Sequence, residues 1–345
     1  MANEINQNQS TDEVVVANTS TEAALEPATV TANATVEKLS NEKKPYVYKM
    51  SKFEKRETIM GYIFSLPVTL GVLIFVYYPA IQSAVYSLYD FSGYTTFEFI
   101  GFKNFIDMFT YDRELTLKVF KNTFVYAIIN VPVSLLLGYL VALLVNVKVK
   151  GISLFRTLFY MPTVIPGVAS GILWKDIFDE TYGIMNQIFS YVGIPRSGFF
   201  ADPSTAMITL IMTGVWGVGG SMIIWLSAFK NIPGVLYESA KIDGASAVRR
   251  VLNITLPLST SMIFYNLVTG VIGSLQVFST FILAGNGGKG PDECLYFVAV
   301  KIYNDAFVDS RIGYACAVGW VQFAIIGLLT FVMFKSGGWV QYGED

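Results

Sequence analysis

The sequence predicts an all-α, polytopic membrane protein with six transmembrane helices and a helix-turn-helix loop between the fourth and the fifth. Three observations lead to this fold class. The 345 residues are 53% hydrophobic, 15% aromatic and only 14% charged, far more apolar than an average soluble domain. Several stretches reach the length of about 20 helical residues that crosses a bilayer core of about 30 Å. A basic cluster precedes the first of these stretches, which indicates a cytoplasmic N-terminus.

Residues 1–50 differ from the rest of the chain. Residues 1–40 are rich in Asn, Thr, Glu and Ala and contain no aromatic residue, so they cannot bury enough apolar surface to offset the entropy lost on folding. They also lack the basic start and apolar core of a secretory signal peptide, and we expect neither cleavage nor export of this end. We therefore predict a disordered cytoplasmic tail at 1–50 and a transmembrane domain at 51–345. The basic cluster consists of Lys43, Lys44, Lys49, Lys52, Lys55 and Arg56.

Six apolar stretches divide the transmembrane domain. They lie at about 59–79, 120–145, 154–173, 205–228, 261–284 and 312–334. An even number of spans returns the C-terminus to the side of the N-terminus, so both termini are predicted to be cytoplasmic in a multi-pass protein of the cell membrane. Proline and glycine interrupt several spans, among them Pro162 and Pro166, which membrane helices tolerate where neighbours satisfy the freed backbone groups. This pattern predicts kinked helices around a pathway.

Two connections on the opposite side of the membrane have recognisable patterns. Residues 101–109 alternate aromatic and polar residues, as a short helix on the membrane surface does. The face of that helix is predicted to carry Phe102, Phe105, Ile106 and Phe109. The glycine-rich residues 285–291 lack the GxxxxGK[ST] spacing and the strand-to-helix context of a phosphate-binding loop, so we predict a turn there.

The connection between the fourth and fifth spans is compact and charged. Asn231 can cap a helix that starts at Pro233, where the missing proline N–H costs nothing. Gly244 can take the left-handed conformation that closes this helix, and Ser246 can cap a second one. The second helix carries Val248, Val251 and Leu252 on one side. The predicted topology places this helix-turn-helix, residues 233–257, in the cytoplasm.

Composition disfavours several classes of function. The chain contains no histidine, the commonest general base and metal ligand, and its two cysteines, Cys294 and Cys316, lack the spacing of a metal site or a disulfide framework. The net charge of −2 gives no reason to expect a nucleic-acid partner. We therefore expect neither an enzyme nor a cofactor or metal site.

Residues 233–257 resemble a known motif. Glu238-Ser-Ala-Lys-Ile-Asp-Gly244-Ala, followed by Pro257, resembles the cytoplasmic "EAA" loop of permease subunits of binding-protein-dependent ABC importers. Ser239 departs from the second alanine of the motif, and Val248 and Val251 stand where many relatives carry Trp and Phe. Other segments are similar to the carbohydrate branch of the family, that of the maltose and glycerol-3-phosphate permease subunits: 101–105, 155–166, 182–186, 288–291 and 313–315. The resemblance covers about residues 59–335.

The resemblance implies a permease subunit that translocates a sugar or oligosaccharide delivered by an extracytoplasmic solute-binding protein. It implies that ATP is hydrolysed on separate ABC ATPase subunits, and this chain has no Walker sequence of its own. A second permease subunit, in a heterodimer, and the lipid bilayer are the other expected partners. The residues that the resemblance assigns to ATPase coupling are Glu238, Ser239, Ala240, Asp243, Gly244, Ala245 and Pro257.

The predicted spans also contain polar and aromatic residues that could line a substrate pathway. Polar groups inside a bilayer are expensive and face a cavity or another helix. The candidates are Asn130, Trp216, Tyr265, Asn266, Ser274, Gln276 and Gln322. Neutral amides and hydroxyls beside aromatic faces suit the hydroxyls and C–H surfaces of sugars, but any one of them can instead join helices by hydrogen bonds.

Two alternative functions stay open on the sequence. An ion-coupled secondary transporter should show an ionisable residue well inside a span or an inverted repeat, whereas the Asp and Glu residues keep to loops and span edges. An ABC importer for a non-sugar solute, such as a polyol phosphate, would share the loop motif.

Overall fold

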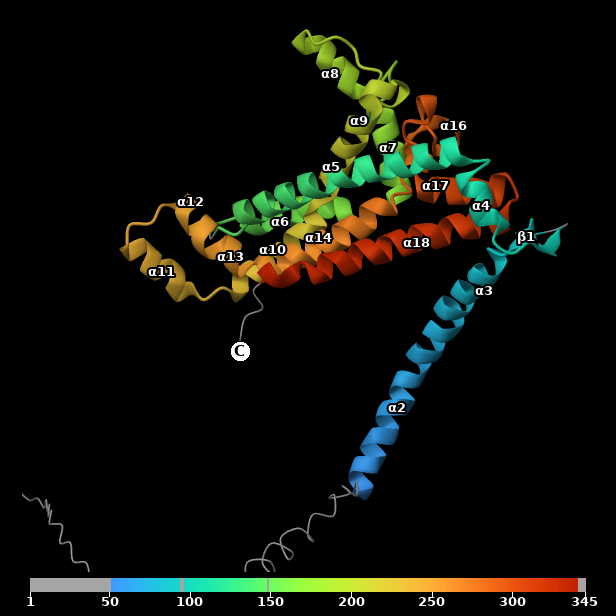
Figure 1. Ribbon diagram of the computed structural model, residues 1–345. Helices are drawn as coiled ribbons and strands as arrows, with labels where there is room; N and C mark the ends of the chain where they lie inside the picture. The colour runs from blue at the N-terminus through green and yellow to red at the C-terminus, as the bar shows by residue number, and fades with distance from the viewer. Residues whose placement is uncertain (1–50, 94–95, 148, 341–345) are drawn as a thin grey trace, which may run out of the picture. The chain divides into compact units, whose positions relative to one another are not determined.

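The computed structural model describes residues 51–93, 96–147 and 149–340, and these residues are mostly helical (Figure 1). The predicted tail at 1–50 lies outside the described residues. The all-α fold class is confirmed, since the strands of the described residues form a single two-stranded hairpin. The chain divides into two units, Met1–Thr69 and Leu70–Asp345.

The described part of the first unit belongs to helix α2, Lys52–Val72. The helix begins with a capping box, in which the Ser51 N–H donates to the Glu54 carboxylate at 2.7 Å and the Glu54 N–H donates to Ser51 Oγ at 3.2 Å. The helical stretch continues through the π-helix η1 (Leu73–Tyr77) and α3 (Tyr78–Tyr86). Its apolar run is long enough to cross a membrane, in agreement with the first predicted span.

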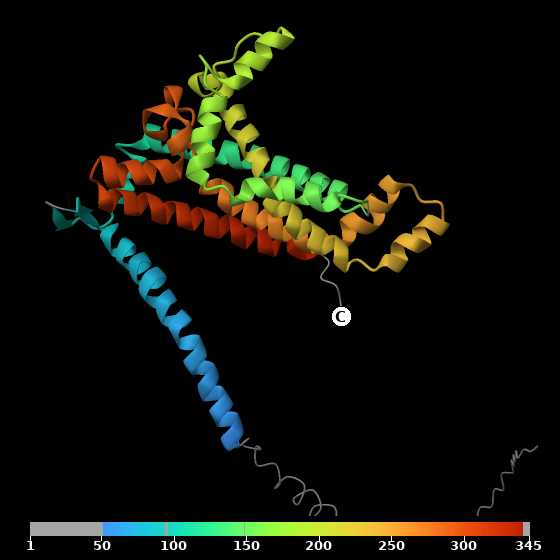
Figure 2. The same ribbon diagram turned by 180° about the vertical axis from the view of Figure 1, so that it is seen from behind.

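Four long helical segments form the centre of the second unit (Figures 1 and 2). They are α5 (Arg113–Val145); α9 (Pro203–Val215) with η4 (Trp216–Val218) and α10 (Gly219–Asn231); α14 (Thr260–Leu275); and α18 (Ile312–Lys335). Helix α5 contacts α14, α10 and α9, and α18 contacts α14. Helix α5 is therefore the central helix of this unit.

Shorter elements lie at the two ends of these helices and between them. Near the start of α5 are β1 (Tyr89–Phe91), β2 (Phe97–Phe99), α4 (Lys103–Phe109), α15 (Thr280–Leu283), α16 (Gly285–Gly288), η6 (Pro291–Glu293), α17 (Val298–Tyr303) and η7 (Asn304–Val308). Between α5 and α9 the chain forms α6 (Ile152–Tyr160), η2 (Met161–Val164), α7 (Gly167–Ile177), α8 (Ile184–Val192) and η3 (Phe199–Ala201). The opposite end carries α11 (Gly234–Ile242), α12 (Ala247–Arg250), η5 (Val251–Thr255) and α13 (Leu256–Leu258), and η8 (Gly337–Trp339) follows α18.

Four helical stretches of the described residues are long and apolar enough to cross a membrane, or six if each of two bent pairs counts as one span. The four correspond to the first, second, fourth and sixth predicted spans, although α5 begins at Arg113 rather than near residue 120. The first bent pair, Ile152–Val164 and Gly167–Ile177, turns by 98° within the third predicted span. The second pair, Ala247–Leu258 and Thr260–Leu275, turns by 69° where the 233–257 segment meets the fifth.

The third predicted span is kinked at Pro166, one of the predicted break points, and the fifth ends earlier than predicted. Ile165 is extended, with ψ 128°, because a residue that precedes a proline is disfavoured in the helical region. Helix α14 ends at Leu275 instead of continuing to 284, and the Gln322 side-chain amide donates to the Leu275 carbonyl at 2.6 Å, which satisfies a terminal carbonyl of the helix. Pro166 marks the kink in the sequence, whereas the end of α14 at Leu275 involves Gln322, a residue 47 positions away.

Both patterned connections have local structure close to the prediction. Helix α4 lies within 101–109, with Phe102, Ile106 and Phe109 exposed, but Phe105 turns inward against the buried cluster around Met108. The predicted four-residue face therefore keeps three of its members. In residues 285–291 the left-handed backbone at Asn286 and Gly287 makes the four-residue α16 irregular, as expected of the predicted turn.

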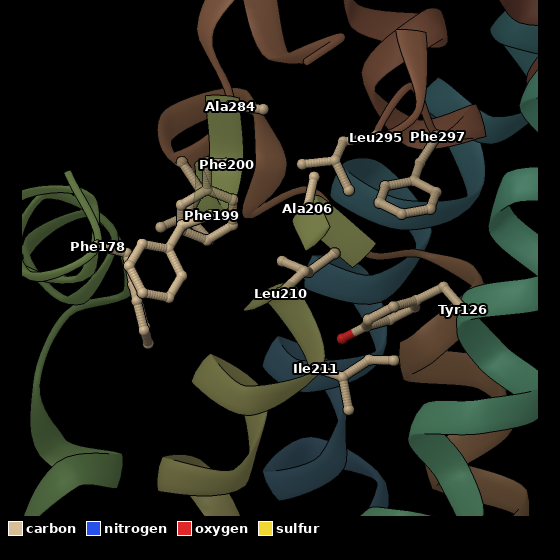
Figure 3. Close-up of a cluster of buried hydrophobic side chains, with 11 residues drawn as sticks. Tyr126, Phe178, Phe199, Phe200, Ala206, Leu210, Ile211, Ala284, Leu295 and Phe297 are labelled. Carbon is tan, nitrogen blue, oxygen red and sulfur yellow. The ribbon is translucent and has the colours of Figure 1, made fainter. Parts of the chain in front are cut away.

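Buried apolar clusters join the helices at both ends. Figure 3 shows the cluster in which α5, α9, η3 and the end of α7 meet the chain segments beside α15 and α17: Tyr126, Phe178, Phe199, Phe200, Ala206, Leu210, Ile211, Leu283, Ala284, Leu295 and Phe297. Another cluster joins α5 to α10 near the end of the helices that carries the 233–257 segment. There the Tyr139 ring packs edge-on against Trp225 and Phe229. The helices that approach the projecting segment are therefore anchored in a packed core.

Candidate functional site

The first arm of the 233–257 loop is helix α11. It begins at Gly234 with Pro233 in the cap position, whereas Asn231, the predicted cap, is the last residue of α10. The difference arises because α10 continues to Asn231 and the chain then becomes extended at Ile232, with ψ 123°. Ile232 is buried, so the junction between α10 and α11 is anchored while its backbone is non-helical.

The turn between the arms has the predicted glycine geometry. Gly244 has φ +73°, in the left-handed region that favours glycine. The Ala245 N–H donates to the Ala240 carbonyl at 2.9 Å and the Gly244 N–H to the Lys241 carbonyl at 3.1 Å, the two hydrogen bonds of a Schellman motif. Ser246 Oγ accepts from the Arg249 N–H at 3.3 Å and caps the second arm, as predicted.

The second arm contains a π-helix before Pro257. Helix α12 has only four residues and leads into η5, whose closing hydrogen bond joins the Leu256 N–H to the Val251 carbonyl. Proline lacks an N–H and its ring disturbs the preceding helical turn, so a local π-turn accommodates Pro257 in α13. The arm then meets α14 at Ser259, which is fully buried.

The tip of the loop presents both carboxylates and apolar side chains to the surroundings. Glu238, Ser239, Asp243 and Gly244 are exposed, and Ala240 and Ala245 are half-buried. Apolar residues of the same loop are also exposed: Val235, Leu236, Ile242, Val248 and Leu252. Ile242 is 88% exposed, an unusual environment for a side chain in a segment that the positive-inside analysis places in water. An exposed apolar patch beside carboxylates is typical of a protein–protein interface.

A polar cavity of about 280 Å³ lies between α5, α10 and α14. Its lining consists of Asn130, Val131, Ser134, Leu135, Ser221, Ile224, Asn266, Thr269, Gly270 and Ser274. The Asn130 side-chain amide donates to Ser274 Oγ at 3.1 Å, so these two residues bridge α5 and α14 at the cavity wall. The Asn266 amide donates to the Met262 carbonyl of its own helix at 2.8 Å. Three of the sequence candidates are thus brought together.

A second cavity, of about 220 Å³, has an aromatic wall. Trp216 and Trp174 meet edge to face with ring centroids 4.8 Å apart. Tyr126 also lines this cavity, and Figure 3 shows its hydroxyl pointing toward α9. Hydroxyls are supplied by Ser170, Thr213 and Ser279. Aromatic faces with a few hydroxyls form the kind of surface that contacts sugars.

The remaining sequence candidates lie elsewhere. Tyr265 is 52% exposed and Gln276 is exposed at the end of α14, and neither lines the cavities found in the described residues. Gln322 is buried and bonded to the Leu275 carbonyl, which is the helix-joining role that the sequence left open for each candidate.

Sequence reasoning missed several cavity residues, among them Tyr126, Ser134, Trp174, Ser221 and Thr269. A partial signal was present. Ser134 lies four residues after Asn130 and Thr269 three after Asn266, spacings that put side chains on one helix face. No spacing rule connects Ser221 on α10 with these residues.

A buried ionic cluster lies near the start of α5, far from the 233–257 loop (Figure 1). Lys301 is 1% exposed and its Nζ lies 2.7 Å from Asp112 Oδ2 and 3.1 Å from Asp305 Oδ2. Burial acts to raise the pKa of Asp112, but hydrogen bonds from Lys301 and Tyr314 outweigh it and hold that pKa below its ordinary value. Burial raises the pKa of Asp305 despite Lys301. Both carboxylates lie outside the apolar helices, in agreement with the sequence analysis.

Comparison with known proteins identifies relatives of this chain. Residues 134–342 match the family model described as binding-protein-dependent transport system inner membrane component. The chain is 36% identical over 299 residues to the probable ABC transporter permease protein YesP of Bacillus subtilis, an alignment that covers 85% of this chain and 96% of that protein. It is 30% identical over 290 residues to the trehalose/maltose transport system permease protein MalF of Thermococcus litoralis, covering 83% and 96%.

Solved structures show the same fold. A chain of a bacterial ABC transporter involved in the import of the acidic polysaccharide alginate superposes with a TM-score of 0.73 at 24% identity, covering 84% of this chain and 98% of that one. A chain of a bacterial alginate transporter in complex with an alginate pentasaccharide-bound periplasmic protein gives a TM-score of 0.71 at 26% identity, covering 81% and 93%.

Proposed function

Since this chain belongs to the binding-protein-dependent transport system inner membrane components, we propose that its 233–257 loop is the surface on which an ABC ATPase subunit docks. The chain is a permease subunit of a sugar ABC importer. An ion-coupled secondary transporter, which the sequence left open, does not fit this family. In this proposal a separate subunit hydrolyses ATP, and the loop transmits the resulting movement to the membrane helices.

The observation that carries the proposal is the capped, exposed geometry of the loop. Ser239 lies on the exposed side of α11, and a Cβ added at Gly244 would meet no atom of this chain within 4 Å. Another protein can therefore approach the backbone closely at the turn. Glu238 and Asp243 offer carboxylates for charge-assisted hydrogen bonds, and Ile242 offers an apolar anchor.

The proposed topology follows from this assignment. An ATPase that uses cellular ATP lies in the cytoplasm, so the loop faces the cytoplasm and the α16 end faces outward. Six spans then leave both termini cytoplasmic. The outer face receives the solute-binding protein, and a second permease subunit, in a heterodimer, completes the pathway.

The sugar is proposed to pass along the two cavities between the helices. The cavity around Asn130, Asn266 and Ser274 supplies amides and hydroxyls, and the cavity around Trp174 and Trp216 supplies aromatic faces. Neutral hydrogen-bonding groups can replace the water molecules bound to a sugar with little net gain in binding free energy. The sugar is then not held tightly, and transport requires that it can leave each site again.

The docking proposal is tested by Ser239→Trp in the complete transporter reconstituted in proteoliposomes. The indole would block the approach to α11 without straining the turn, so we expect capture of the ATPase by the tagged permease to be lost and sugar uptake to fall by about a hundredfold or more, as for loss of an interface hot spot. Ser190→Trp, at an exposed position of α8 away from the loop, is the matched control and should leave ATPase capture unchanged. Normal ATPase capture by Ser239→Trp would contradict the docking role.

The pathway proposal is tested by Asn266→Leu. Among the described residues, the Asn266 side-chain amide donates a hydrogen bond only to a carbonyl of its own helix. The substitution therefore removes a polar group from the cavity without breaking a bridge between helices. We expect sugar uptake to fall by about tenfold, the effect of roughly one lost hydrogen bond to a sugar, with ATPase capture unchanged. Gln276→Leu, outside the cavities, is the control. Equal uptake by both variants and the wild type would argue against this route.

A further inference from the structure

We propose that Tyr237 is a positioning residue whose hydrogen bond to Thr255 fastens the two arms of the 233–257 loop into one lever. The inference rests on the proposed docking function and adds to it how the movement reaches the membrane helices. The Tyr237 hydroxyl lies 2.9 Å from Thr255 Oγ1, and the two residues are 18 positions apart. Among the described residues, no other side-chain hydrogen bond joins α11 to residues 247–258.

The need for such a fastening follows from how the loop is attached. On one side, Ile232 and Pro233 are extended, with ψ 123° and 128°, so α11 does not continue the α10 helix. On the other side, the second arm meets α14 at a 69° bend around Ser259. Neither junction is a continuous helix. A push on α11 alone would be absorbed by rotation at these two junctions unless the arms were joined near their base.

Thr255 is well placed to receive the push. It is 3% exposed and forms the end of the π-helix η5, directly before α13. The π-helix adds a residue to the turn and so changes the direction in which Thr255 points relative to a regular helix. A buried hydroxyl is held in place by its partner, because leaving it unpaired costs free energy. The Tyr237 side chain is half-buried and fills this role.

The connection leads to the proposed pathway. Thr255 is followed by α13, by the buried Ser259 and by α14, whose Asn266 and Ser274 line the polar cavity. The other arm leads through Ile232 to α10, which contributes Ser221 to the same cavity. A lever fastened at Tyr237 and Thr255 therefore moves α10 and α14 together. An unfastened loop could follow the ATPase without displacing α14.

The test uses Tyr237→Phe and Thr255→Val in the complete transporter in proteoliposomes, each of which removes the hydroxyl and keeps the shape. The measured quantities are capture of the ATPase, the rate of ATP hydrolysis, and the amount of sugar imported per ATP hydrolysed. We expect unchanged capture and hydrolysis, and a fall of about fivefold in sugar per ATP, the shift in population that one lost hydrogen bond produces. Thr255→Ser, which keeps the hydroxyl, should restore the ratio.

The double variant distinguishes a shared bond from two separate effects. If the two hydroxyls act through one hydrogen bond, Tyr237→Phe with Thr255→Val lowers sugar per ATP no further than either single change. Tyr191→Phe, at a 91% exposed tyrosine of α8, is the control and should leave the ratio unchanged.

Each contrary outcome has a defined meaning. A wild-type ratio in Tyr237→Phe, or independent effects of the two substitutions, would overturn the lever. Loss of ATPase capture in Tyr237→Phe would also overturn it, because Tyr237 would then be a docking contact. Failure of docking itself is detected separately by Ser239→Trp, which leaves the Tyr237–Thr255 bond in place.

Discussion

The two ends of the second unit differ in whether their charged side chains are exposed or buried in ion pairs. At the 233–257 loop, Glu238 and Asp243 are exposed and form no ion pair among the described residues. At the other end, Lys301 is enclosed with Asp112 and Asp305, and the Tyr314 hydroxyl also donates to Asp112 at 2.6 Å. Exposed carboxylates without a partner are available to another protein, whereas the enclosed ones are occupied in joining the start of α5 to the α17–α18 region.

The same contrast applies to the backbone. The turn between the two arms of the loop relies on local devices within a few residues, namely the Schellman motif at Gly244 and the Ser246 cap. The glycine-rich turn at the other end and η6, which follows it, are held by residues distant in sequence: Asn304 donates to the Gly287 carbonyl at 3.1 Å, and Asn122 to the Glu293 carbonyl at 2.9 Å. The turn between the arms is therefore defined by its own residues, while the turn at the other end is fixed by helices distant in sequence and keeps its place relative to them.

The largest expected effect is at the buried ionic cluster. Lys301→Met would leave two enclosed carboxylates without their cation, and we expect a loss of about 3–5 kcal/mol in the free energy of unfolding, measured by thermal denaturation in detergent. The matched control is Lys118→Met, which breaks the 3.0 Å ion pair between Lys118 and Glu293. The Lys118 side chain is 44% exposed and that of Glu293 is 35% exposed. Solvent screens that pair, so its loss should cost less than about 1 kcal/mol. Equal losses in the two variants would remove the distinction between enclosed and exposed charges.

A smaller effect is expected at the turn of the loop. Gly244→Ala forces a side chain into the left-handed region and should destabilise the turn by about 1 kcal/mol, whereas Gly244→Asn should cost less because asparagine tolerates that region. Neither Cβ meets another atom of the chain within 4 Å. If the turn itself matters for docking, ATPase capture should decrease more in Gly244→Ala than in Gly244→Asn. If bulk at the turn matters instead, the larger asparagine should decrease capture more. That result would mean that the ATPase requires a small residue at position 244 for close contact, and not the left-handed backbone itself.

The candidate site was only partly predictable. The turn of the loop could be anticipated, because a left-handed glycine and a serine cap depend on neighbours within about five positions, whereas the Asn231 cap was wrong and the π-helix η5 was not predicted. The pathway was harder: Asn266 and Ser274 reach a cavity, but Tyr265 and Gln276 do not, although all four lie within one predicted span. Which face of an apolar helix meets its neighbours cannot be read from a span that is hydrophobic on every side.

The sequence by itself determined the fold class, the approximate spans, the break at Pro166 and the geometry of the turn at Gly244, since each depends on composition or on a few consecutive residues. Only the tertiary structure decided that α14 ends beside Gln322, that Lys301 joins two carboxylates, and that Tyr237 reaches Thr255. The tertiary structure also explains why residue 219 is a glycine: a Cβ there would collide with the Phe159 backbone carbonyl of the neighbouring helix α6. These contacts bring together residues separated along the chain, and their partners are chosen by how the helices pack, which no local pattern records.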